Sequence, residues 1–151
     1  MKIAGFFNEQ MICLDLKATG KNEAIEELGE YINKTNKVRD YKRFIREVKE
    51  RDEMATTGIG NEIAIPHART DTADNFIIVL GRSENGVDFG AFDNKPAKLI
   101  FLMAIPKREI DEYLIVLAHL TKMLKQEQLL RGLYAAKSGE EAVNLMKTAE
   151  N

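Results

Sequence analysis

The 151-residue sequence has one cysteine, two histidines, three prolines and no tryptophan. A single cysteine, Cys13, excludes an internal disulfide and is typical of a protein in the reducing cytoplasm. It lies in the apolar stretch at residues 11–14, which favours a buried thiol over a reactive one. A zinc site would need carboxylates from distant positions, and no ligand spacing supports one. We expect no metal and no other cofactor.

The sequence also lacks an excess of either charge and any long apolar run. Lys plus Arg is 22 and Asp plus Glu is 24, so the net charge is −2. This near equality gives no reason to expect binding to nucleic acid or to an anionic membrane. No run approaches the roughly 20 apolar residues of a membrane span, and the first residues do not resemble a signal peptide. We therefore expect a cytoplasmic protein with no direct membrane insertion.

Short apolar runs bounded by turn residues predict β-strands at residues 11–16, 63–65, 76–80 and 99–105. Pro66 and Pro106 end two of these strands, because proline has no N–H to donate to a neighbouring strand. Residues 83–86 predict a turn. The polar residues that follow position 67 predict a loop.

Apolar residues at helical spacing predict two helices before residue 56, the first capped by Thr19 or Asn22 and the second by Asp40. From about residue 109 the chain becomes helical again. The apolar stripe expected on this helix consists of Ile110, Leu114, Leu117, Leu120 and Leu124. A short helix follows at 129–134, and Ser138 caps a last one. Interspersed strands and helices predict a single α/β domain over residues 1–151, with helices on both faces of a sheet.

The residues most suggestive of chemistry lie between positions 56 and 69, which read TTGIGNEIAIPHAR. Two glycines precede the strand at 63–65, and His67 comes directly after Pro66, at a strand end where its side chain can reach solvent. A histidine placed there is a candidate nucleophile or acid–base group. The alternative is an ordinary loop histidine.

Arg51 lies near the end of the second predicted helix, just upstream of this stretch. One interpretation is a surface arginine, which is favoured near a helix C-terminus. The other is a guanidinium that neutralises a phosphoryl group on His67, because its donors match phosphate oxygens and it stays protonated. Arg69 also lies two residues from His67, either as a solvated loop charge or as a phosphate contact.

A resemblance to a known family favours the functional interpretation of His67 and of Arg51. The segments Thr57-Gly58-Ile59-Gly60 and Ile63-Ala64-Ile65-Pro66-His67-Ala68, with Arg51 upstream, resemble the fructose/mannitol family of enzyme IIA domains, including its nitrogen-regulatory branch. This family belongs to the bacterial phosphoenolpyruvate-dependent sugar phosphotransferase system. The resemblance covers nearly the whole chain and implies the mannitol-type enzyme IIA fold, a mixed sheet flanked by helices.

The resemblance also implies a function. His67 would accept a phosphoryl group from the phosphocarrier HPr or an HPr-like carrier, through Nε2, and pass it to an enzyme IIB domain. Arg51 would stabilise charge, and neither metal nor nucleotide would be needed. Thr57 and the backbone around Gly58 and Gly60 could donate hydrogen bonds near the site, although the glycines could serve only the turn.

The sequence departs from the family at one position. The family usually carries a second histidine in the pattern His-Leu-x-x-Leu-x-x-Leu, and the matching segment here begins with Tyr113. His119 is not its equivalent, because six residues rotate it by roughly 240° around a helix. We expect His119 to be a surface or partly packed residue. A tyrosine hydroxyl can donate a hydrogen bond to a phosphoryl group, whereas its ordinary pKa of about 10 lies far above that of an imidazole.

A second hypothesis is a stand-alone regulatory module that binds a kinase, transporter or transcriptional regulator according to the phosphorylation of His67. The absence of fused IIB or IIC segments in the sequence and the replacement of the second histidine both favour it. A third is a relative that carries no phosphate at all.

Overall fold

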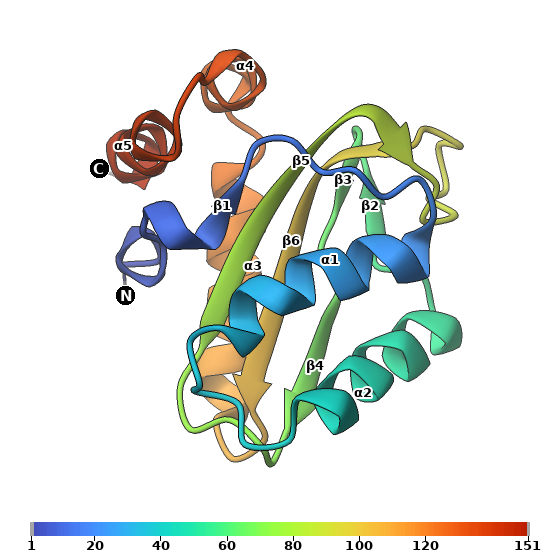
Figure 1. Cartoon of the computed structure of the whole chain (residues 1–151). Helices are drawn as coiled ribbons and strands as arrows, with labels where there is room; N and C mark the ends of the chain where they lie inside the picture. The colour runs from blue at the N-terminus through green and yellow to red at the C-terminus, as the bar shows by residue number, and fades with distance from the viewer. Residues whose placement is uncertain (1, 151) are drawn as a thin grey trace.

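A mixed six-stranded sheet forms the centre of the computed structural model, which describes residues 2–150 (Figure 1). The strand order is β1-β5-β6-β3-β2, and β4 also pairs with β6. Strands β5 and β6 are antiparallel, as are β2 and β3, whereas β1 runs parallel to β5, and β3 and β4 run parallel to β6. The bounds are β1 Ile12–Cys13, β2 Gly58–Gly60, β3 Ile63–Ala64, β4 His67–Thr70, β5 Ile77–Val87 and β6 Ala97–Pro106.

Helices cover both faces of this sheet, as predicted (Figure 1). Helices α1 (Lys21–Asn33) and α2 (Tyr41–Met54) pack on one face, and α3 (Ile110–Met123), α4 (Glu127–Ala135) and α5 (Gly139–Glu150) on the other. Two single-turn 3-10 helices, at Ala4–Phe6 and Glu9–Met11, precede β1. The α/β fold with a mixed sheet is thus confirmed.

Strand β6 shows why this sheet needs cover on both sides. Its residues alternate between the two apolar cores: Leu99, Phe101 and Met103 face α3–α5, and Ile100 and Leu102 face α1 and α2. Successive side chains of a strand point to opposite faces, so a continuous apolar run is buried on both. The buried run at 99–105 is therefore confirmed.

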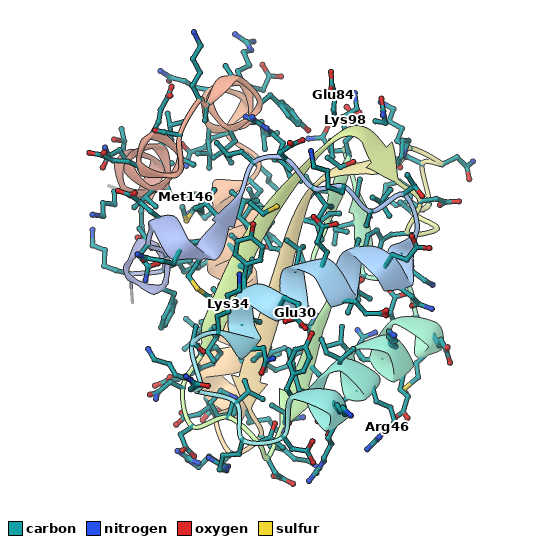
Figure 2. The ribbon with its side chains drawn as sticks, in the orientation of Figure 1. Glu30, Lys34, Arg46, Glu84, Lys98 and Met146 are labelled. Carbon is teal, nitrogen blue, oxygen red and sulfur yellow. The ribbon has the colours of Figure 1, made fainter. Side chains whose placement is uncertain are left out.

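The predicted apolar stripe of α2 is buried, and polar residues such as Arg46 point outward from this helix (Figure 2). Asp40 caps α2 as predicted, since its side chain accepts a hydrogen bond of 3.1 Å from the backbone N–H of Arg43. The caps predicted for α1 are wrong. Gly20 is its N-cap and makes no side-chain hydrogen bond, so Thr19 precedes the cap and Asn22 lies inside the first turn.

The turn predicted at residues 83–86 is a bulged part of β5 instead. The pairing of β5 with β6 shifts register between Arg82 and Val87, and Gly86 has φ +83°. The Ser83 hydroxyl accepts a hydrogen bond of 3.0 Å from the Gly86 N–H. Turn-forming residues here bend a strand without ending it. No helix within residues 2–150 is long and apolar enough to cross a bilayer.

Candidate active site

His67 is the first residue of β4 and lies beside Met103 of β6. The segment that follows it is a strand as far as Thr70, so the predicted polar loop is wrong for residues 69–70, whereas residues 71–74 lie outside the strands as predicted. Pairing with the parallel strand β6 up to Pro106 holds residues 67–70 extended despite their polar side chains. His67 is only 6% exposed, so its ring lies in the wall of a pocket and not on an open loop.

This pocket, called here the His67 pocket, has a volume of about 190 Å³. It brings together four residues singled out in the sequence: His67 and Arg69 from β4, Arg51 from the last turn of α2, and Tyr113 from the first turn of α3. The other lining residues are Glu47 and Ala68. Side chains from α2 and α3 thus meet the imidazole of β4, although the three elements are separate in the sequence.

The hydrogen bonds of the imidazole define its tautomer. Nδ1 lies 2.8 Å from the backbone carbonyl oxygen of Ile65, which can only accept, so Nδ1 carries a hydrogen. In the neutral ring Nε2 therefore has the free lone pair. The Tyr113 hydroxyl lies 3.2 Å from Nε2 and donates to it. The nitrogen that faces Tyr113 is the nucleophilic one.

Burial lowers the pKa of His67 below its ordinary value. The Arg51 guanidinium lowers this pKa further, whereas the hydrogen bond to the Ile65 carbonyl and the charge of Asp52 raise it. The net result is a lowered pKa of His67. The ring is accordingly neutral near pH 7, the state in which Nε2 can attack an electrophile.

Two guanidinium groups line the same pocket as the imidazole. Arg51 donates to the carbonyl oxygen of Ala55 at 3.0 Å, and Arg69 donates to that of Lys107 at 3.1 Å while lying 5.7 Å from the centre of the Tyr113 ring. Within residues 2–150 neither forms an ion pair with a carboxylate, and the buried Nε of Arg69 has no hydrogen-bond partner. Cations with unused donors suit the oxygens of a phosphoryl group.

The remaining predicted site residues do not line the His67 pocket. Thr57 is buried and donates to Asp52. Gly60 has φ +87°, and a Cβ on Gly58 would lie 3.2 Å from that of Phe89. The two glycines serve a tight turn and a close approach of backbone, which is the alternative left open by the sequence.

Sequence reasoning gave no role to two carboxylates near the site. Glu47 lines the pocket and accepts a hydrogen bond of 2.7 Å from Thr70. It lies four residues before Arg51, and this spacing places both on one helix face, so the sequence contained a signal for it. Asp52, buried behind Thr57, had no such signal.

His119 lies outside the pocket. Its Nε2 is 2.8 Å from the carboxylate of Glu150, and its side chain is about one-third exposed, at 35%. The partly packed histidine expected from the sequence is confirmed. Among residues 2–150, no three His, Cys, Asp or Glu side chains gather in a way that could hold a metal ion.

The first turns of α3 differ from the predicted stripe. Val116, Leu120 and Met123 are buried, whereas Ile110 and Leu114 are 48% and 60% exposed. Ile115, also exposed, lies near them on the helix. Leu120 and Leu124 of the predicted stripe are buried, so the prediction is wrong only in the first turns, where the helix is apolar on more sides than the sheet can cover. The exposed residues lie within three positions of Tyr113 on the helix.

Residues 5–149 match the family described as "Phosphoenolpyruvate-dependent sugar phosphotransferase system, EIIA 2". The chain is 35% identical over 129 residues to the fructose-specific EIIA component of Haloferax volcanii, covering 85% of this chain and 84% of that protein. It is 31% identical over 146 residues to the fructose-specific EIIABC component of Bacillus subtilis, covering 97% of this chain but 23% of that protein.

Two solved structures are similar over nearly their whole length. Nitrogen regulatory protein IIA-Ntr from Neisseria meningitidis has a TM-score of 0.88 at 26% identity, covering 95% of this chain and 98% of that one. The mannitol enzyme IIA of Escherichia coli, in complex with phosphorylated mannitol enzyme IIB, has a TM-score of 0.82 at 26% identity, covering 94% and 97%. The chain belongs to the EIIA type 2 family of the phosphoenolpyruvate-dependent sugar phosphotransferase system, whose members are phosphotransfer components.

Proposed function

We propose that this protein is a phosphoryl carrier that accepts a phosphoryl group on Nε2 of His67 from HPr or an HPr-like carrier and passes it to an enzyme IIB. The observation that carries the proposal is the imidazole itself. Its Nδ1–H is held by the Ile65 carbonyl, which leaves the Nε2 lone pair in a pocket lined by Arg51 and Arg69, neither of which pairs with a carboxylate of residues 2–150. The buried thiol of Cys13 fits a cytoplasmic location for this exchange.

The transfer is a displacement at phosphorus. The Nε2 lone pair of His67 forms a new N–P bond as the N–P bond to the donor's imidazole breaks, and the released electron pair stays on the donor nitrogen. A donor ring protonated on its other nitrogen leaves as neutral imidazole. His67 keeps its Nδ1 hydrogen and becomes a phosphorylated imidazolium. Arg51, Arg69 and the Tyr113 hydroxyl are placed to donate to the phosphoryl oxygens.

The exposed apolar residues of α3 complete this proposal, since a carrier must dock two proteins in turn. Near Tyr113, α3 carries three apolar residues that are exposed and not packed in the core: Ile110, Leu114 and Ile115. A small apolar surface with charges at its edge is typical of transient interfaces. The structure of a related mannitol enzyme IIA bound to phosphorylated enzyme IIB supports an enzyme IIB as one partner.

The test is phosphorylation in a reconstituted system of phosphoenolpyruvate, enzyme I and HPr. We expect one acid-labile, base-stable phosphate per chain in the native protein and none in His67→Ala. His119→Ala is the matched control, because it removes the other histidine, which lies outside the pocket. Equal phosphorylation of native protein and His67→Ala would contradict the proposal.

A regulatory carrier is the second candidate, favoured by the likeness to a nitrogen regulatory protein and by Tyr113 at the site. In this case phosphorylation of His67 would control binding to a regulated partner protein. Membranes containing a sugar permease separate the two functions. Transfer of phosphate from the loaded protein to sugar supports the carrier. Loaded protein that transfers nothing, but is retained by a partner differently from unloaded protein, supports the regulator.

A further inference from the structure

Asp52 is a buried carboxylate in an unfavourable place. It is 3% exposed and lies in the last turn of α2, where the negative end of the helix dipole opposes its charge. Burial of an ionised carboxylate is costly unless it is paired and hydrogen-bonded. Asp52 Oδ1 accepts from the Thr57 hydroxyl at 2.6 Å and from the Thr57 N–H at 3.1 Å. Its Oδ2 lies 2.7 Å from Nζ of Lys21, the first residue of α1.

These contacts lead directly to the acceptor imidazole. The Thr57 carbonyl accepts a hydrogen bond of 2.8 Å from the Ile65 N–H. The carbonyl of the same residue, Ile65, accepts from Nδ1 of His67. An ion pair between Lys21 and Asp52, followed by hydrogen bonds through Thr57 and Ile65, therefore links the start of α1 to the imidazole at the start of β4.

We propose that Asp52 and Lys21 are positioning residues for the acceptor imidazole. The buried carboxylate fixes the Thr57 segment, which through Ile65 holds the Nδ1–H of His67, and its negative charge stabilises the imidazolium of the phosphorylated ring. The proposal rests on His67 being the acceptor. Thr57 therefore acts on the site through Ile65, as the link between Asp52 and His67, and not by contact with phosphate.

Electrostatics support this role. Arg51 and Asp52 are neighbours on α2 and act on His67 in opposite directions: the cation lowers its pKa and the carboxylate raises it. The other charged or titratable groups at the ring are Glu47, Arg69 and Tyr113. The nucleophilicity of a nitrogen increases with its basicity, so a buried ring beside a guanidinium benefits from a compensating anion.

The experiment is an NMR titration of the His67 ring in the unphosphorylated protein. We expect Asp52→Asn, which keeps the shape of the side chain but removes its charge, to lower the titration midpoint by roughly 0.5 to 1 pH unit. Lys21→Met should raise the midpoint, because it leaves the carboxylate without its cation. Asp52→Glu should bring it back toward the native value. Unmoved midpoints in Asp52→Asn and Lys21→Met, or shifts in the same direction, would overturn the proposal.

Glu150→Gln is the matched control. Glu150 is likewise a carboxylate whose side chain is 2% exposed, with backbone N–H donors at Ile3 and Ala4 and the His119 imidazole at 2.8 Å, but it lies outside the His67 pocket. Its replacement should leave the His67 midpoint unchanged. If Asp52→Asn does not fold, Lys21→Met decides the outcome alone, since the Lys21 side chain is 34% exposed.

Phosphorylation of the same variants separates this inference from the proposed function. The ring titration needs no phosphoryl donor. If the variants shift the titration midpoint of His67 as expected but the native protein accepts no phosphate on His67, the positioning role stands and the carrier function is contradicted. If the native protein is phosphorylated on His67 but the midpoints do not move, the carrier function stands and the positioning role is contradicted.

Discussion

The hydroxyl of Tyr113 donates a hydrogen bond to the nitrogen on which we place the phosphoryl group. When the N–P bond forms, this lone pair is no longer available, and the hydroxyl can turn to a phosphoryl oxygen instead. Loss of one neutral hydrogen bond is worth about 0.5–1.5 kcal/mol. We expect Tyr113→Phe to slow phosphorylation roughly 2- to 10-fold. Tyr134→Phe is the control, because Tyr134 lies on α4, outside the pocket; equal rates in both variants would contradict the role.

A histidine at the same position would change the pH profile. An imidazole titrates near pH 6.5, whereas a tyrosine hydroxyl titrates near pH 10. We expect Tyr113→His to add a pH-dependent step to the phosphorylation rate between about pH 5 and 8 that the native protein lacks. Identical pH profiles and phosphorylation rates in the native protein and in Tyr113→His would contradict this expectation.

Arg51 has a charge-assisted role in the proposed transfer, so its loss should be more severe. Hydrogen bonds to charged groups contribute about 1.5–3 kcal/mol. We expect Arg51→Gln to reduce the phosphorylation rate roughly 10- to 100-fold with little change in thermal stability. Arg46→Gln removes an outward-pointing arginine of the same helix (Figure 2) and should transfer at the native rate. A rate loss shared by both variants would indicate a general charge effect.

At the scale of elements, α2 matters because it carries Arg51 and Asp52 in its last turn. The Asp40 cap at its other end should affect stability rather than chemistry. We expect Asp40→Ala to lower the free energy of unfolding by about 1 kcal/mol, and Asp40→Asn, an equally good cap, to leave it nearly unchanged. Urea unfolding measures both. Equal losses in the two variants would show that charge, and not capping, is important at Asp40.

The elements also show what a single sequence can and cannot predict. The stripes of α1 and α2 were correct because each helix has one apolar face. The stripe of α3 was correct at Leu120 and Leu124 but wrong in the first turns, because Leu114 and Val116 are both apolar and only the position of the sheet decides which is covered. Strand β4 was missed because its pairing partner in β6 lies more than 30 residues away, beyond any local pattern.

The same distinction applies to the site. Local residues made His67 and Arg51 candidates, and the resemblance favoured their functional interpretation and pointed to Tyr113. Asp52 could not, because its importance depends on Lys21 and Thr57, which only the packing of α1 and β2 against α2 brings to it. The pairing of buried charged groups follows no regular spacing along the sequence, so no sequence pattern predicts it.

At the scale of the whole molecule, docking should depend on the exposed apolar residues of α3. We expect Leu114→Asp to raise the carrier concentration needed for half-maximal phosphorylation of His67 several-fold, without affecting stability, because Leu114 is 60% exposed. Phe92→Asp is the control: Phe92 is also an exposed apolar residue, 83% accessible, but not part of α3. Equal effects of both changes would contradict a specific docking surface.

Global stability should also report the environment of His67. Its pKa in the folded protein is lowered, so below the unfolded value of about 6.5 the unfolded chain binds more protons than the folded one. Stability therefore falls as pH decreases through about 6.5 and stops falling, for this group, below the folded pKa. His67→Gln should remove this part of the pH dependence. Denaturant midpoints of both proteins from neutral to acidic pH provide the measurement; parallel curves would contradict the lowered pKa.

The contact between Glu150 and the first residues of the described chain has a consequence for anything attached to this protein. Glu150 accepts hydrogen bonds from the backbone of Ile3 and Ala4, so these residues lie together on the opposite side of the molecule from α2 (Figure 1). A fluorescent label attached beside Ala4 and one attached beside Glu150 would therefore occupy the same region, away from the helix that carries Arg51.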